Sequence, residues 1–129
     1  MLGNPNPRAV LPLLDAGADA NARDKDGRTA LILFAGYYQD PVVVKALLDA
    51  GADVNAQDAE GNTALILEAK YSDTPYSNSP ACMQALVDAG ADVTLQDNAG
   101  NTAWEYIKHN DALKGTKAYR RMSDLQRGK

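Results

Sequence analysis

Short segments whose apolar residues recur at helical spacing alternate along the chain with polar segments that contain glycine. One such segment spans residues 42–48, and its apolar residues recur at the spacing of a single helix face: Val43, Val44, Leu47 and Leu48. A second apolar segment, Thr29–Ala35, precedes it and begins with a residue type that caps helices well. Together these patterns predict two short helices joined by a turn.

The polar segment that follows predicts a hairpin. Gly51 lies just past the second helix, where a left-handed backbone conformation ends many helices and glycine adopts it without strain. A short extended stretch, Asp53–Gln57, leads to a turn at Asp58–Gly61, and Thr63 can then cap the next helix. The predicted unit is therefore helix, turn, helix, hairpin.

This unit is repeated along the chain. The tetrapeptide Ala-Gly-Ala-Asp occurs at residues 16–19, 50–53 and 89–92, and an Asp-x-x-Gly-x-Thr-Ala turn follows at residues 24–30, 58–64 and 97–103. The aspartates that open these turns are separated by 34 and 39 residues. A period of this size is typical of stacked-repeat proteins, whose units cannot bury their apolar faces alone.

The combination of motifs resembles the ankyrin-repeat family, over nearly everything from about Pro7 to Met122. The usual Thr-Pro-Leu-His of that family reads here as Thr-Ala-Leu-Ile at residues 29–32 and 63–66, and as Thr-Ala-Trp-Glu at residues 102–105. We expect Ile32 and Ile66 to replace the histidine hydrogen bonds by apolar packing. Prolines before the second helices and the closing segment 113–119 are similar to a mainly bacterial subgroup; these prolines are Pro7, Pro41 and Pro80.

The resemblance implies an all-α ankyrin-repeat solenoid of about three and a half repeats in a single domain, residues 1–129. We expect a partial repeat at 1–23, full repeats at 24–57 and 58–96, and a C-terminal capping repeat at 97–129. Relative to the 33-residue ankyrin unit, insertions of about one and about six residues enlarge the inter-helix turns at 37–41 and 71–80.

Composition agrees with one small domain, since 45% of the residues are hydrophobic. The sequence contains no run of about 18 apolar residues, so no membrane span is predicted. The N-terminus lacks the pattern of a signal peptide. We therefore expect a soluble protein, cytoplasmic by default, with a signal removed from a longer precursor left open. The single cysteine, Cys82, is predicted to be a buried structural thiol, and the single histidine, His109, to be exposed at a helix end.

Charge divides the chain into an acidic body and a basic tail. Residues 1–107 hold six basic and 15 acidic residues, a balance of −9, and residues 108–129 have a balance of +5. An acidic body disfavours nucleic acids and favours a basic partner. The basic tail is predicted to be a solvated helical face, with Lys117, Arg120 and Arg121 near a helix C-terminus, where positive charge is favourable. The alternative is contact between the tail and an acidic neighbour.

No catalytic motif is present, so we expect no enzyme activity, cofactor or metal. One histidine and one cysteine are too few for a zinc site, and the Asp-Lys-Asp-Gly segment does not fit a calcium-binding loop. The repeated aspartates, Asp24, Asp58 and Asp97, are predicted to accept hydrogen bonds from turn N–H groups.

A protein-binding function is what the resemblance implies, since ankyrin proteins commonly meet partners with their hairpin tips and the concave face of their first helices. Position by position, the expected partner-binding residues are Lys25, Asp26, Arg28, Phe34, Tyr37, Tyr38, Glu60, Asn62, Glu68, Lys70, Tyr71, Tyr76, Asn98 and Asn101. The tyrosines can act as interface anchors. For Tyr37 and Tyr71, stacking between repeats is the alternative.

We therefore predict a non-enzymatic protein-binding module. The alternative is a docking or inhibitory ankyrin fragment of a larger multidomain protein or effector. The first unit has only one predicted helix, Arg8–Ala16, and one side of its apolar surface has no preceding helix to cover it. We expect this segment either to fray or to mediate self-association.

Overall fold

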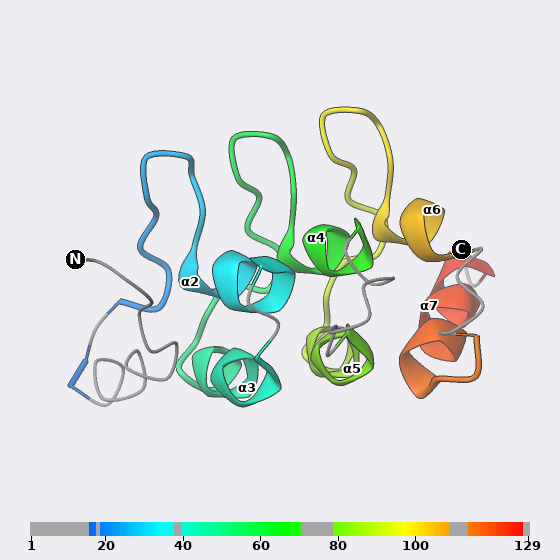
Figure 1. The fold of residues 1–129 in the computed structure, drawn as a ribbon, viewed down its shortest axis with the longest axis horizontal. Coiled ribbons are helices and arrows are strands. Elements are labelled where there is room, and N and C mark those ends of the chain that lie inside the picture. Colours follow the sequence, from blue (N-terminus) through cyan, green and yellow to red (C-terminus); the bar gives the residue numbers. More distant parts are fainter. Residues whose placement is uncertain (1–15, 18, 38–39, 71–78, 109–113, 128–129) are drawn as a thin grey trace.

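The described part of the chain forms a row of helices with loops projecting from one edge (Figure 1). The computed structural model describes residues 16–17, 19–37, 40–70, 79–108 and 114–127. Within these ranges there are six α-helices, one π-helical segment and no strand. In chain order they are α2 (Ala30–Ile32), η2 (Leu33–Tyr37), α3 (Pro41–Asp49), α4 (Ala64–Lys70), α5 (Ser79–Asp88), α6 (Ala103–Ile107) and α7 (Lys117–Arg127). The all-α fold expected from the sequence is confirmed, and the predicted hairpins are loops without strand pairing.

The helices form two layers. One layer, next to the loops, contains α2 with η2, then α4, then α6, and the other contains α3, α5 and α7 (Figure 1). Helix α4 contacts both η2 and α6, and α5 contacts both α3 and α7. Each helix is thus covered by its neighbours along the row, as in stacked-repeat proteins.

Polar caps fix the helix ends. The hydroxyl oxygens of Thr29 and Thr63 accept hydrogen bonds from backbone N–H groups three residues later, at 3.3 and 3.1 Å. The cap predicted at Thr63 is confirmed. Helix α3 begins after Asp40, whose carboxylate accepts from the N–H groups of Val42 and Val43. After α3, Gly51 has a φ of +94°, so its predicted left-handed conformation is also confirmed.

The first helix of the first complete unit differs from the sequence-based expectation. The sequence predicted an ordinary helix from Thr29, followed by a turn enlarged at residues 37–41. Instead, Leu33–Tyr37 is π-helical, so the helix is already wider before the turn begins. A π-helical turn contains more residues than an α-helical turn and is frequent near functional sites. This widened segment ends at Tyr37.

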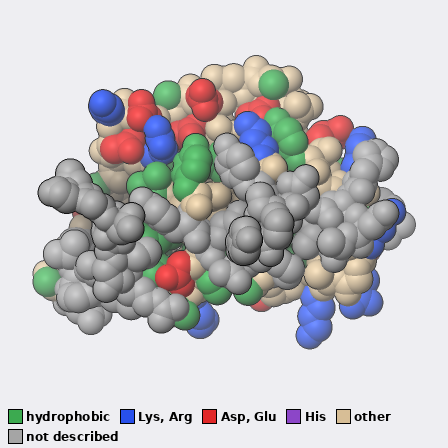
Figure 2. Space-filling model, in the orientation of Figure 1, with side chains coloured by type: hydrophobic (Ala, Val, Ile, Leu, Met, Phe, Trp, Pro, Cys, Tyr) green, Lys and Arg blue, Asp and Glu red, His purple; other side chains and the backbone are tan. Residues whose placement is uncertain are grey.

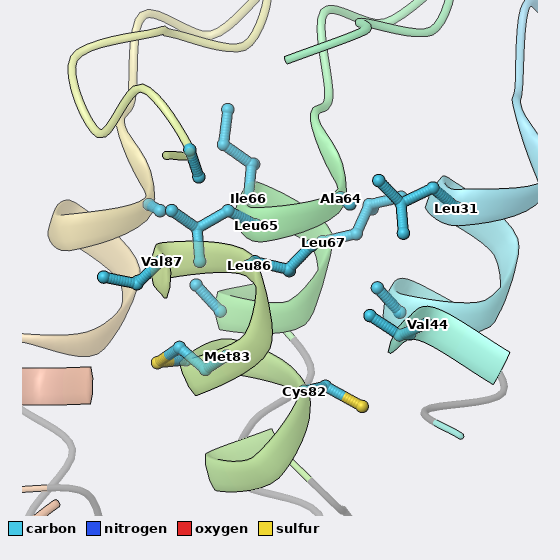
Figure 3. Close-up of a cluster of buried hydrophobic side chains, with 14 of the residues drawn as sticks. Leu31, Val44, Ala64, Leu65, Ile66, Leu67, Cys82, Met83, Leu86 and Val87 are labelled. Atoms are coloured by element: carbon cyan, nitrogen blue, oxygen red, sulfur yellow. The ribbon is translucent and has the colours of Figure 1, made fainter. Parts of the chain in front are cut away.

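The core lies between the two helix layers. Of the apolar face predicted for α3, Val43, Val44 and Leu47 are fully buried and Leu48 is half-buried. Figure 3 shows side chains of α4 and α5 filling the space between their helices, with Met83 and Cys82 pointing to opposite sides of α5. The residues expected to replace the family histidine, Ile32 and Ile66, are also buried.

Cys82 is buried in this core, as the sequence predicted. Burial raises the pKa of the Cys82 thiol, and the carboxylate of Glu68 acts in the same direction. Because the thiolate is the reactive form, this thiol has a structural role.

The basic residues of the tail lie at the other end of α7 from the one expected. Lys117 is the first residue of α7 and Arg120 is the fourth, so they do not complement a helix C-terminus. The apolar side of α7 buries Ala118 and Met122, and the Tyr119 ring lies 4.9 Å from that of Trp104. Helix α7 is the last described helix of the row, and its basic residues Lys117, Arg120 and Arg121 are exposed. Figure 2 shows basic side chains at this end of the molecule.

Several predictions fall outside the described residues. These are the N-terminal helix up to residue 15, with the self-association assigned to it, and the residues Tyr38, Tyr71, Tyr76 and His109. In the part of the chain that is described, no helix is both long and apolar enough to cross a bilayer.

Candidate functional site

An aspartate opens each projecting loop and builds its turn. Oδ1 of Asp58 accepts hydrogen bonds from the backbone N–H groups of Glu60 and Asn62, both at 2.9 Å. Asp24 and Asp97 make the equivalent pairs of bonds in their own loops. At Asp24, the bond from the Arg28 N–H outweighs burial and lowers the pKa of the carboxyl below its ordinary value. The predicted structural role of these aspartates is confirmed.

Neighbouring loop tips are joined by backbone hydrogen bonds. The N–H of Ala59 donates to the carbonyl of Asp26 at 3.0 Å, and the N–H of Asn98 donates to the carbonyl of Glu60 at 2.9 Å. The tips are therefore held at fixed spacing. A rigid surface loses less conformational entropy on binding than a flexible one does.

Side chains reinforce this spacing at two further levels of the loops. Arg23 donates to the carbonyl of Gln57 at 2.8 Å, and Gln57 in turn donates to the carbonyl of Gln96 at 3.0 Å. Asn21 and Asn55 each accept the backbone N–H of an aspartate in the following unit, at 2.6 and 2.7 Å. These cross-links were not predicted from the sequence. The sequence did contain a signal for them, because polar side chains recur at equivalent positions of the repeat. Arg23 and Gln57 occupy one such position, and Asn21 and Asn55 occupy another.

The first and second tips are separated by a pocket of about 220 Å³, lined by Asp26, Arg28, Tyr37, Asp58, Ala59 and Glu60. Within it, the guanidinium of Arg28 lies 2.7 Å from the Asp26 carboxylate and 5.5 Å from the centre of the Tyr37 ring. Burial by itself would lower the pKa of the Arg28 guanidinium, but the charge and hydrogen bond of Asp26, together with Tyr37 and Asp24, outweigh burial and raise that pKa. Tyr37 itself is 45% exposed. The pocket thus combines three acidic side chains, one basic side chain and an accessible aromatic ring.

The aspartate that opens the third loop, Asp97, has different neighbours from those of Asp58. Nζ of Lys70 lies 3.5 Å from Oδ2 of Asp97 and 5.3 Å from the centre of the Tyr106 ring. The hydroxyl of Tyr106 donates a hydrogen bond to the same carboxylate oxygen. The carboxylate of Asp97 is therefore buried and paired with a cation of the preceding unit.

These contacts keep Asp97 charged. Burial by itself would raise the pKa of the Asp97 carboxyl, but the hydrogen bonds from Tyr106, Asn101 and Ala99 and the charge of Lys70 outweigh it. The resulting pKa lies below the ordinary value of 3.8. A carboxyl whose pKa is lower in the folded state stabilises the fold above its unfolded pKa and loses that contribution as pH falls through the folded pKa.

Replacing Tyr106 with Phe tests this network. We expect the free energy of unfolding to fall by about 1.5–3 kcal/mol at pH 7, the range for hydrogen bonds to charged groups. The loss should shrink at a pH below the lowered pKa of Asp97, where protonation of its carboxyl removes the charge that the hydroxyl stabilises. Urea unfolding at both pH values measures it, and an equal loss at both would contradict the role given to Asp97.

The structure places the expected partner-binding residues in different environments. Lys25, Asp26, Tyr37, Glu60 and Asn98 are exposed, and Arg28, Phe34, Lys70 and Asn101 are half-buried. Asn98 also donates to the carbonyl of Ala59 at 3.2 Å. The pocket brings together only four of these residues: Asp26, Arg28, Tyr37 and Glu60.

Two of the expected residues are not on the surface. Asn62 is 1% exposed and Glu68 is 0% exposed. Helix α4, which carries Glu68, lies between η2 and α6 and is buried from Ala64 to Ala69. The expectation that these two side chains face a partner is corrected.

Comparison with known proteins identifies the repeat. A family model described as ankyrin repeats, in three copies, matches residues 2–97. No curated protein matches the chain. The bacterial subgroup stays a prediction.

Proposed function

Because the chain belongs to the ankyrin-repeat family, we propose that it is a non-enzymatic module that binds a protein partner through its loop tips and the adjoining ends of its first helices. Members of this family are generally protein-protein interaction modules. The observation that carries the proposal is the row of loop tips, held together by backbone hydrogen bonds and containing a pocket with an exposed tyrosine. Tyrosines of this kind are common energetic centres of protein interfaces.

The chemistry of the described residues supports binding over catalysis. In each of the three repeated aspartates, one carboxylate oxygen accepts hydrogen bonds from backbone N–H groups of the turn. Burial raises the pKa of the Cys82 thiol, which disfavours a nucleophilic role. In the described ranges, no group of three or more potential metal ligands lies together.

Site-specific photo-crosslinking tests the proposed surface. A photoreactive amino acid is placed at Glu60, on the second tip, in one variant and at Lys45, on the outer side of α3, in a matched control, since both residues are exposed. We expect a protein from the source cells to crosslink at position 60 and not at position 45, and mass spectrometry identifies it. Crosslinks at position 45 alone would place the binding surface on the other helix layer.

The same experiment also tests the alternative function, a docking or inhibitory fragment of a larger multidomain protein. If the partner is another domain of a longer polypeptide, the crosslink at position 60 joins the ankyrin repeats to that domain. Both outcomes support the tip surface, and the mass of the crosslinked peptide separates them.

A further inference from the structure

The pocket between the first two tips has the size of a single side chain. Its volume is about 220 Å³, whereas pockets for cofactors and drug-sized ligands measure about 300–1,000 Å³. It is also open between two loops that are fixed by the hydrogen bond from Ala59 to Asp26. One side chain projecting from a partner therefore fits it better than an independent small molecule does.

The charge of the pocket favours a cation. Asp26 is already paired with Arg28 at 2.7 Å. The other two acidic residues, Asp58 and Glu60, form no ion pair with any described residue. The lining therefore retains a net negative charge. A carboxylate from a partner would instead be repelled by the negative charges of Asp58 and Glu60.

The aromatic ring narrows the choice among cations. Tyr37 is 45% exposed, and the distance of 5.5 Å from Arg28 shows that its ring already attracts a guanidinium. A planar guanidinium can stack on an aromatic ring and donate several hydrogen bonds to carboxylates, whereas a lysine ammonium is a point charge. The part of the pocket lined by Tyr37, Asp58 and Glu60 is therefore suited to an arginine side chain.

We propose that this pocket binds an arginine side chain of the protein partner. The proposal rests on the proposed function, because it assigns a ligand to one position of the tip surface. It also accounts for the difference between Asp58 and Asp97, the aspartates that open the second and third loops. Lys70 neutralises Asp97 of the third loop at 3.5 Å, whereas Asp58 of the second loop forms no ion pair with a cation of the described chain.

The test uses N-acetyl-arginine amide as the probe, with the lysine and glutamate analogues as comparisons. In NMR titrations of the full chain, we expect saturable shifts in the backbone amide signals of residues 37 and 58–60 with the arginine probe. The lysine probe should bind more weakly, and the glutamate probe should not shift these signals. Added salt should weaken the binding because exposed charges are screened.

Two charge-matched variants locate the site. Glu60→Gln should weaken binding of the arginine probe by about threefold, the effect of an exposed ion pair. Glu105→Gln removes the same charge from an exposed residue of α6, outside the pocket, and should leave the binding unchanged. Tyr37→Leu should reduce the preference for arginine over lysine. The amide spectra of the variants show directly whether each remains folded.

Three outcomes would overturn the proposal: equal binding by wild type and Glu60→Gln, shifts outside the pocket only, or preferential binding of the glutamate probe. The last would make Arg28 the anchor for an acidic partner residue. The result can be separated from that of the proposed function, since a crosslink at position 60 without arginine binding would keep the tip surface and remove this ligand.

Discussion

Replacing Leu47 with Ala is expected to lower the free energy of unfolding by about 2–5 kcal/mol, the range for core leucines truncated to alanine. Leu47 is fully buried on α3, and α3 packs against both η2 and α5. The cavity left by the substitution would therefore lie between two units of the stack. Chemical denaturation followed by far-UV circular dichroism measures the change.

The matched control lies on the same helix. Val42 is 48% exposed, so Val42→Ala should change the free energy of unfolding by less than about 0.5 kcal/mol. If Leu47→Ala also changes it by less than about 0.5 kcal/mol, α3 is not packed as described. A single unfolding transition in both variants is expected, because each unit completes its core with residues of its neighbours.

Features that depend on one unit of sequence could be predicted. Thr63 caps a helix through a contact three residues away, and Gly51 adopts its left-handed conformation at a local chain reversal. Burial of Cys82 followed from the apolar residues around it on one helix. Local backbone preference decides the two cap positions, and the apolar spacing on one helix was a sufficient signal for the burial of Cys82.

Burial of polar residues could not be predicted in the same way. Glu68 occupies the repeat position of Phe34, and the sequence analysis placed both on a partner-facing groove. The structure buries Glu68 because α4 has a neighbouring helix on each side, whereas Phe34 in η2 is only half-buried. The difference arises from the position of the unit in the stack, which the residue type does not report.

The pocket also depends on relations between units. Arg28 and Tyr37 belong to one unit, and Asp58 and Glu60 belong to the next. Most of the lining residues were separate candidates in the sequence, but the repeat pattern does not show that they surround one space. The widening at Leu33–Tyr37 was likewise not predicted, since an extra residue can enlarge either a helix or the turn after it.

The second large effect is expected at Gly36, within this widened segment. An alanine Cβ at position 36 would lie 2.6 Å from the Cβ of Leu67 on α4, closer than real Cβ contacts allow. Leu67 is fully buried, so it has little room to move. Gly36→Ala should therefore force η2 and α4 apart and lower the free energy of unfolding by about 1–3 kcal/mol, the usual cost of overpacking.

Gly115→Ala is the control for the glycine-to-alanine change itself. Among the described residues other than its chain neighbours, none has a heavy atom within 4 Å of a Cβ built at Gly115, so this substitution should be neutral or stabilise the fold by about 0.4–1 kcal/mol through the unfolded chain. Denaturant midpoints of the two variants give the comparison. Equal stability of Gly36→Ala and Gly115→Ala would contradict the close approach of η2 and α4. If the predicted loss is observed, the amide signal of Tyr37 should shift as well, because displacement of η2 moves the residue at its end.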